Sequence, residues 1–390
     1  MVSEGELAAL AAGSGRPETI ARLAADQDTR VRLLLWGVHR RHPMPCAYGL
    51  LEDLEARHPE PAAVVLRYPP VRAWARAALL GHAPPEFLGN IAAAVAVRCG
   101  EDGPGPADGM PLELPSLGKA ADDRPAGEWA VRKGAVTVGG EELDLDGPGW
   151  RALGRAGVAG ADILLDDIAA HRTPGLPPGS FGGRRRQWER LLGEAGGVLL
   201  RRHWSVAAEL RALVRSIAPL PGPGQRHATV PGAFGCVAMT LPPDPVAAAM
   251  TLAHEVQHAK MAALQAEVPL VRPDHQELFY APWRRDPRPA LGLLHGAYAH
   301  LGVTGFWRRQ RAAQDGTHAH VQFVRWRDST LTACADLLAA GCLTEAGDFF
   351  VRTMRGSLTS WLDEPVPDRA RRLAREQTLG HRLRWQEEHR

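Results

Sequence analysis

The chain has 390 residues and a formal net charge of +2, with 46 Lys and Arg residues against 44 Asp and Glu residues. This balance excludes the strongly basic field typical of nucleic-acid-binding proteins, so we expect no nucleic-acid partner. The length allows a large core in one domain or two.

The five cysteines are scattered and form no CxxC pair, a pattern typical of reduced thiols inside the cell. The first thirteen residues contain Glu4 and Glu6 and lack the basic stretch of a signal peptide. No apolar run reaches the length of a membrane span. We therefore expect a cytoplasmic protein that does not associate with a membrane.

Prolines divide residues 1 to about 100 into short segments with helical periodicity. The turn-rich stretch Asp102–Asp108 then indicates a boundary between an N-terminal helical region, 1–101, and a catalytic domain, 109–390. The predicted helices are Glu4–Ala12, Pro17–Ala25, Thr29–His39, Ala47–Arg57, Val71–Leu80 and Pro85–Arg98.

Beyond the boundary, alternating residues around Gly139 and Gly140 predict a hairpin over Trp129–Leu145. The apolar run Ala233–Thr240 favours a buried strand. The predicted fold is mainly α with a small β component (α+β), with a metal site between the helix after this strand and a later helix. Further helical segments are predicted at Trp150–Ala156, Arg184–Leu220, Pro289–Gln314, Val321–Ala340, Thr344–Leu362 and Pro367–Arg390.

The most informative stretch is His254-Glu255-Val256-Gln257-His258, which reads HExxH. Asp244 as N-cap and Pro245 at the first helical position predict a helix that continues to about Glu267. On that helix the two imidazoles project from one face, about 6 Å apart, so both can bind one divalent metal ion. Glu255 lies beside His254 and can reach a water molecule or substrate on the metal.

A catalytic metal normally needs a third protein ligand. Glu277 follows His258 at a spacing that some zinc peptidases use, but nearby prolines make its segment a poor helix. His295 and His300 lie on a predicted helix rich in small residues, which allow close approach to the metal helix. Because these two histidines are five positions apart, they diverge around the helix, and we expect only one to face the metal.

Several blocks of sequence together resemble a bacterial family of HExxH-motif proteins found with ribosomally made peptides, whose members act as 2-oxoglutarate-dependent peptide β-hydroxylases. Weaker similarity at Val65–Val71 and Ala73–Ala75 extends the resemblance over most of the chain. The main blocks are Leu114–Lys119, Ala233–Gly235, His254–Lys260, Leu278–Arg284, Asp286–Pro289, Leu294–Ala299 and Phe306–Arg308.

The resemblance implies Fe(II) as the metal, 2-oxoglutarate and O2 as co-substrates, and a ribosomally synthesised precursor peptide as the partner. His295 becomes the expected third ligand, with His300 and Glu277 as alternates. A fixed guanidinium is suited to the far carboxylate of 2-oxoglutarate, and we expect Arg284, or else Arg288, to supply it. Glu255 is then a residue that orients water or substrate beside the metal.

Two other functions fit the same motif. A zinc metallopeptidase would use Glu255 as general base, with Glu277 or a histidine as third ligand. A non-catalytic partner in peptide maturation would bind a structural metal only. The metal content and the fate of a peptide substrate distinguish these hypotheses.

Overall fold

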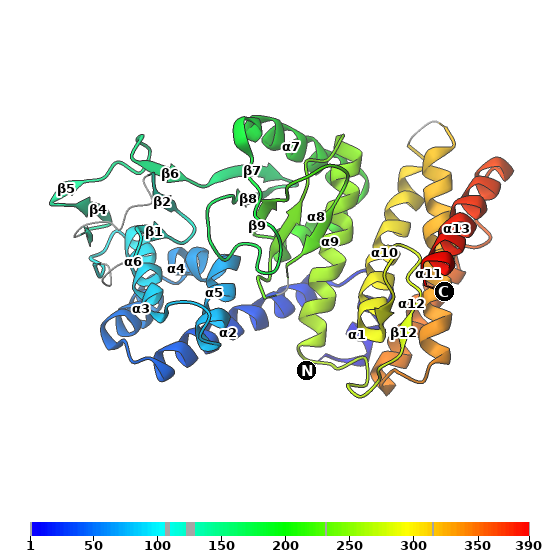
Figure 1. Cartoon of the computed structure of the whole chain (residues 1–390), viewed down its shortest axis with the longest axis horizontal. Helices are drawn as coiled ribbons and strands as arrows, with labels where there is room; N and C mark the ends of the chain where they lie inside the picture. Colours follow the sequence, from blue (N-terminus) through cyan, green and yellow to red (C-terminus); the bar gives the residue numbers. More distant parts are fainter. Residues whose placement is uncertain (1, 106–109, 122–128, 231, 314–315, 390) are drawn as a thin grey trace. The chain divides into compact units, whose positions relative to one another are not determined.

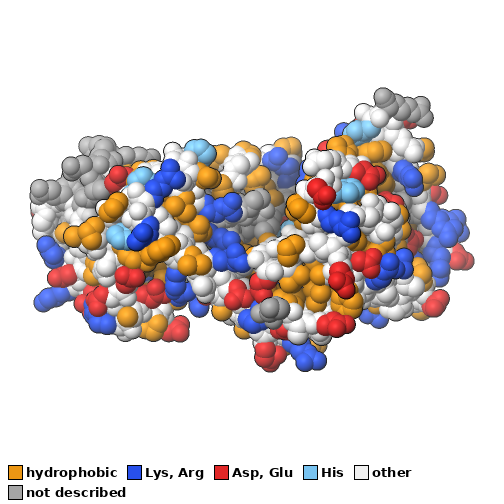
Figure 2. All heavy atoms as spheres, turned by 90° about the horizontal axis from the view of Figure 1, so that it is seen from below, with side chains coloured by type: hydrophobic (Ala, Val, Ile, Leu, Met, Phe, Trp, Pro, Cys, Tyr) orange, Lys and Arg blue, Asp and Glu red, His pale blue; other side chains and the backbone are white. Residues whose placement is uncertain are grey.

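The computed structural model describes residues 2–105, 110–121, 129–230, 232–313 and 316–389. Helices dominate these residues and strands are short, so the predicted mainly α fold with a small β component is confirmed. No helix in the described ranges is both long and apolar enough to cross a membrane. Basic and acidic side chains are interspersed on the face drawn in Figure 2.

The chain divides into two compact units, each built from separate stretches of sequence. Unit 1 contains Met1–Ala24, Glu194–Leu213 and Asp244–Arg390, and unit 2 contains Ala25–Gly193 and Val214–Pro243. The predicted boundary at Asp102–Asp108 lies partly outside the described residues, and the division into 1–101 and 109–390 stays a prediction.

Unit 2 begins with helices that enclose an apolar core. Leu35, Leu54, Trp74 and Ile91 are at most 2% exposed within it. The helix over Pro59–Leu66 was not predicted from the sequence. Pro59 and Pro61 stand in its first turn, where backbone N–H groups have no partner within the helix, so their absence removes no helical hydrogen bond. The helices are α2 (Pro17–Arg41, which begins in unit 1), α3 (Pro45–Arg57), α4 (Pro59–Leu66), α5 (Pro69–Leu79), η1 (Pro85–Phe87) and α6 (Leu88–Cys99).

The prediction of two helices over residues 17–39 was wrong, because α2 is continuous. Its middle, Asp26-Gln27-Asp28, is polar but contains no glycine or proline, so nothing there breaks the helix.

The described residues of unit 2 also form three sheets. The largest has the strand order β10-β11-β9-β8-β7, with parallel pairing of β11 with β9 and of β9 with β8. A second sheet has the order β1-β2-β6, and a third has the order β3-β4-β5. The strands are β1 (Glu113–Leu114), β2 (Gly118–Ala120), β3 (Trp129–Arg132), β4 (Ala135–Val138), β5 (Glu141–Glu142), β6 (Trp150–Ala152), β7 (Gly154–Val158), β8 (Ala161–Leu165), β9 (Ser216–Pro219), β10 (His227–Thr229) and β11 (Cys236–Met239).

The strand predictions were partly right. The turn at Gly139-Gly140 joins β4 to β5, and the expected buried strand is β11. The helical prediction for Trp150–Ala156 was wrong: these residues form β6 and begin β7, whose side chains alternate between buried and exposed. Gly154 and Gly157 weaken a helix there, and pairing with β8 decides the conformation.

The prediction of helix over Arg184–Leu220 holds as far as Leu213. Helices α7 (Arg185–Arg202) and α8 (Trp204–Leu213) follow η2 (Gly182–Arg184), and β9 then replaces the expected helical end. All four residues of β9 are buried, as expected for a strand inside a sheet rather than for an amphipathic helix.

Unit 1 is a helical assembly in which α9 packs against α8 and α10, and α10 packs against α11 (Figure 1). The proline-rich segment between α9 and α10 forms the small hairpin β12 (Leu278–Phe279) and β13 (Arg288–Pro289). Gln314 and Arg390, the expected ends of two helices, lie outside the described residues. The helices are α1 (Glu4–Ala11), α9 (Pro245–Gln265), α10 (Ala290–Gln310), α11 (His318–Ala339), α12 (Glu345–Thr359) and α13 (Asp368–Glu388).

Candidate metal centre

The HExxH motif lies in the middle of α9, and this helix begins where the sequence predicts. Asp244 is the N-cap, and its side chain accepts a hydrogen bond from the Ala247 backbone N–H at 2.8 Å. Pro245 occupies the first helical position, where its fixed φ favours the helix. Most residues from Ala248 to Leu264 are buried, so packing fixes the helix around the motif.

His254 and His258 direct the same ring nitrogen toward one point. Their Nε2 atoms lie 3.1 Å apart, and the rings are inclined at 71°. In the neutral state such a pair accommodates one N–H···N hydrogen bond, and a divalent cation can take the place of that proton. If each nitrogen lay about 2.1 Å from a metal ion, this separation would correspond to an angle of roughly 95° at the metal. The pair therefore fits two adjacent positions of a metal site.

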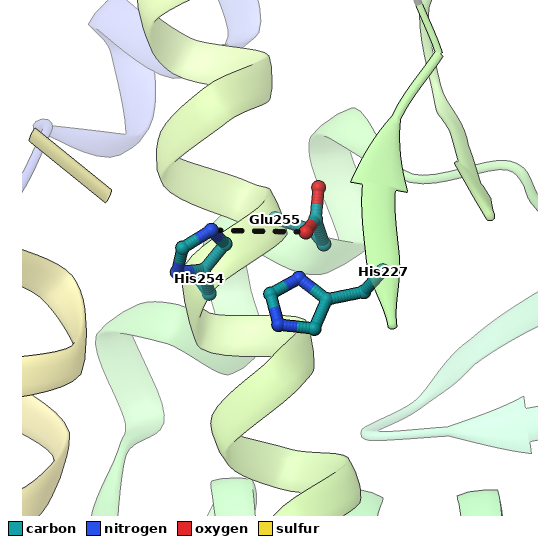
Figure 3. Close-up of side chains that lie close together, drawn as sticks. All are labelled: His227, His254 and Glu255. Carbon is teal, nitrogen blue, oxygen red and sulfur yellow. Dashed lines mark ion pairs between the residues drawn. The ribbon is translucent and has the colours of Figure 1, made fainter. Parts of the chain in front are cut away.

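Glu255 is buried beside this pair. Its side chain is 0% exposed, and its Oε1 atom lies 3.9 Å from Nε2 of His254 (Figure 3). A carboxylate at this distance stabilises positive charge on the histidines or on a metal ion that they hold. His227, also labelled in Figure 3, belongs to β10 of unit 2, and we do not count it among the ligands supplied by unit 1.

His300 approaches His254 from α10. The two rings are perpendicular, with centroids 5.2 Å apart. Nδ1 of His300 lies 2.8 Å from the Gly296 carbonyl oxygen, which can only accept, so Nδ1 carries the proton and the neutral ring keeps a lone pair on Nε2. In this tautomer Nε2 is the ring nitrogen that can bind a metal ion.

Two indole rings hold His300 in place. Trp283 stacks on it with centroids 4.3 Å apart, and Trp326 lies against it at 4.7 Å. His300 is only 6% exposed, so the indoles exclude water from the ring. Trp326 comes from α11, and no feature of its sequence indicates this role.

His295 approaches His258, with ring centroids 5.9 Å apart. Its Nε2 atom lies 2.6 Å from Oε1 of Gln265, which accepts the hydrogen bond and so places the proton on Nε2. Burial, the nearby His258 and Arg288 lower the pKa of His295 to about 4, so the ring is neutral at pH 7. His295 was expected from the resemblance as the third ligand, and that assignment stays a prediction. The hydrogen bonds give the two rings opposite tautomers, so His300 would bind a metal through Nε2 and His295 through Nδ1.

Close approach of α9 and α10 occurs at Gly302, one of the small residues of α10. A Cβ atom at Gly302 would lie 2.5 Å from Cγ of Gln257 on α9. A Cβ atom at Gly296 would instead meet the indole of Trp283 at 2.4 Å, and one at Gly292 would meet Arg288. Gly296 therefore makes room for the indole that stacks on His300.

The remaining expected site residues lie on the segment between α9 and α10. Glu277 has a side chain that is 59% exposed, and its carboxylate lies 3.5 Å from Nε2 of His275, an arrangement typical of a surface residue. Arg284 and Arg288 both pair with Asp286, at 2.8 and 3.2 Å. Hydrogen bonding from Arg284 is the main cause that lowers the pKa of Asp286.

Arg284 and Arg288 differ in their relation to the histidines. The side chain of Arg284 is 52% exposed, whereas that of Arg288 is 35% exposed. The charge of Arg288 contributes to the lowered pKa of His295, so its field reaches the histidine group. Arg288 is therefore the better placed of the two to act on a ligand near His295.

Gln265 contacts His295, although it was not among the residues expected at the site. It lies seven positions after His258, two helical turns further along the same face, so the spacing could have indicated it. Trp283 stands inside one of the blocks that carry the resemblance, but its stacking on His300 depends on the folding of the intervening segment.

Comparison with models of known protein families finds no match, and comparison with curated proteins finds no significant match.

Proposed function

We propose that this protein is an Fe(II)- and 2-oxoglutarate-dependent oxygenase that hydroxylates a β-carbon of a residue in a ribosomally made precursor peptide. The observation that carries the proposal is the convergence of the His254 and His258 Nε2 atoms, 3.1 Å apart on a buried helix. Facial sites of non-haem iron oxygenases use two histidines and a third ligand and leave positions open for the co-substrates. All five cysteines are free, which suits the cytoplasmic location that such a substrate implies.

The chain's own residues have distinct tasks in this proposal. His254 and His258 would hold the iron ion, and His300 or His295 would complete the protein ligands. When bound, the iron supplies the reduction of O2 that couples oxidative decarboxylation of 2-oxoglutarate to hydroxylation, so that peptide, 2-oxoglutarate and O2 give hydroxypeptide, succinate and CO2. Glu255 would stabilise the charge of the site, which three neutral histidines leave uncompensated.

The surroundings of the histidines contribute as well. Trp283 and Trp326 cover His300 and would keep bulk water from that side of the site. The far carboxylate of 2-oxoglutarate would be bound in a bidentate manner by one guanidinium of the segment between α9 and α10, that of Arg284 or Arg288.

The zinc metallopeptidase is the second candidate. In such an enzyme Glu255 would act as general base, which requires contact with a metal-bound water molecule. The full burial of the Glu255 side chain and the exposure of Glu277 favour the oxygenase instead. The third candidate, a non-catalytic maturation partner, would bind metal without turning over a peptide.

One set of incubations separates these functions. The anaerobically purified protein is loaded with Fe(II) and mixed with 2-oxoglutarate, O2 and a candidate precursor peptide, chosen from short reading frames beside its gene, and the peptide mass and succinate are measured. We expect the peptide to gain one oxygen atom for each succinate formed. Peptide fragments with the zinc-loaded protein would support the peptidase, and an unchanged peptide with both metals would support the non-catalytic partner.

Variants connect this result to the site. His254→Ala and His258→Ala are expected to lose bound iron and hydroxylation together, because removal of one ligand leaves an incomplete site. His82→Ala, at an exposed position of unit 2, is the matched control and should keep both. Full iron content and turnover in either HExxH variant would disprove the proposal.

A further inference from the structure

A cavity of about 500 Å³ opens between the end of α9, the proline-rich segment after it and the start of α10. This volume is in the range of sites for small ligands or single side chains. Pro269, Leu270 and Leu291 supply apolar walls, and Gln265, Arg272 and His275 supply polar groups. Gln265 belongs to this lining, whereas the HExxH residues, His295 and His300 do not.

Two buried polar atoms of the lining have no partner among the described residues. One is Nε2 of Gln265, whose amide oxygen already accepts from His295, and the other is Nδ1 of His275. Buried polar atoms in folded proteins are nearly always hydrogen-bonded, so these two atoms need partners that enter the cavity, either water or a ligand group. Because the Gln265 amide oxygen faces His295, the amide NH2 group is the part left for the cavity, and this group is a hydrogen-bond donor.

The start of α10 adds further donors. Pro289, Ala290 and Leu291 line the cavity, and the N-cap Pro289 provides no side-chain hydrogen bond to the first turn. The free N–H groups of a helix start carry partial positive charge and bind anions. This helix start has no acidic residue in its first turn to compete with a ligand.

Arg272 adds a full positive charge. Its Nε atom donates to the Leu343 carbonyl oxygen at 3.1 Å, which orients the guanidinium and leaves other N–H donors of the group for a ligand. No ion pair involving Arg272 is found in the part of the chain that the structure describes. Glu277 lies near Nε2 of His275 but is not part of the lining.

We propose that this cavity binds a carboxylate on a short apolar stem. The guanidinium of Arg272, the amide N–H groups of Gln265 and the start of α10 are all donors or positive charges, and the Pro and Leu walls suit the stem. Two sources share this chemistry: the side chain of an acidic residue in a peptide, and a free dicarboxylate. The proposal does not depend on the identity of the metal.

Gln265 links the cavity to the histidines. Its amide oxygen accepts from Nε2 of His295 at 2.6 Å, and its amide nitrogen belongs to the cavity lining. A bound carboxylate that accepts from this nitrogen would polarise the amide and strengthen the His295 hydrogen bond. The ring of His295 would then be held more firmly in its present tautomer.

Binding is measured by titration calorimetry on metal-free protein in the presence of a chelator, so that failure of the proposed oxygenase chemistry does not affect the result. The probes are succinate, the blocked amino acids N-acetyl-aspartate amide and N-acetyl-asparagine amide, and inorganic phosphate. We expect binding of succinate or of the aspartate derivative, and none of the asparagine derivative. Tighter binding of the aspartate derivative identifies a peptide side chain as the ligand, and tighter binding of succinate identifies a free dicarboxylate.

Variants locate the site. Arg272→Gln should weaken binding by roughly 10- to 100-fold, the scale of a lost charge-assisted hydrogen bond, and Gln265→Leu should weaken it by about 3- to 10-fold. Arg285→Gln is the charge-matched control, because Arg285 is 77% exposed and pairs with Glu388 outside the lining. Thermal unfolding confirms that each variant is folded.

The proposal is overturned if no carboxylate binds, if phosphate binds as tightly as the carboxylates, or if Arg285→Gln weakens binding as much as Arg272→Gln. If Arg272→Gln is unfolded, the Gln265→Leu variant provides the test. Unchanged carboxylate affinity in Gln265→Leu would also overturn the proposal.

Discussion

The ammonium group of Lys260 and the carboxylate of Glu209 form an ion pair of 2.9 Å, with side chains that are 0% and 4% exposed. Lys260 also donates to the Gly13 carbonyl oxygen at 2.9 Å, and Glu209 accepts from the backbone N–H of Gly15 at 3.0 Å. Lys260 lies two residues after His258, so this buried network ties the HExxH helix α9 to α8 and to the chain that follows α1.

Lys260→Met is expected to lower the free energy of unfolding by about 3 to 5 kcal/mol, because it leaves the Glu209 charge buried without a partner. The double variant Lys260→Met/Glu209→Leu should recover most of this loss, since it removes both charges. Arg352→Met is the control, because Arg352 and Asp348 are 58% and 43% exposed and such pairs contribute little. Denaturant unfolding measures all three, and equal losses for Lys260→Met and Arg352→Met would contradict the prediction.

The third ligand can be identified by comparing two single variants. We expect His300→Ala to lower iron affinity by at least about 10-fold, because its ring lies against His254 and its hydrogen bond to Gly296 places the proton on Nδ1. His295→Ala should have a smaller effect, since its Nε2 proton is directed to Gln265. Metal content after dialysis against graded chelator gives both affinities. The reverse order would return the role to His295.

The two arginines near Asp286 are distinguished by 2-oxoglutarate binding. Arg288→Gln should raise the dissociation constant for 2-oxoglutarate by roughly 10- to 100-fold at unchanged iron content, because its charge already reaches His295. Arg284→Gln serves as the comparison, since it removes an equal charge from a more exposed position. A larger effect for Arg284→Gln would assign the carboxylate to Arg284, the residue first expected from the sequence.

Gly302 determines how closely α10 approaches α9. Gly302→Ala should lower the free energy of unfolding by about 1 to 3 kcal/mol, because the new Cβ atom would lie 2.5 Å from Gln257 Cγ. Gln257 cannot shift freely, since its amide donates to the Gly13 carbonyl oxygen at 3.0 Å. Gly305→Ala on the same helix meets nothing closer than 3.9 Å and should be neutral or stabilising. The prediction fails if the two variants are equally stable.

The sequence by itself determined the parts of this protein that depend on neighbouring residues. Asp244 and Pro245 fix the start of α9 through one cap hydrogen bond and one fixed dihedral angle. The i, i+4 spacing then places His254 and His258 on one face, as the Nε2 separation of 3.1 Å confirms. Local interactions of this kind need no knowledge of the rest of the chain.

Tertiary structure decided what depends on distant residues. The β6 and β7 strands, expected as helix, exist because neighbouring strands satisfy their backbone groups. The choice between His295 and His300 depends on Gln265, Trp283 and Trp326, which come from three different segments. No periodicity or propensity encodes such contacts, because side chains far apart in sequence meet only when helices and loops have packed. The pairing of His254 with His258 is thus a property of one helix, whereas its surroundings are a property of the fold.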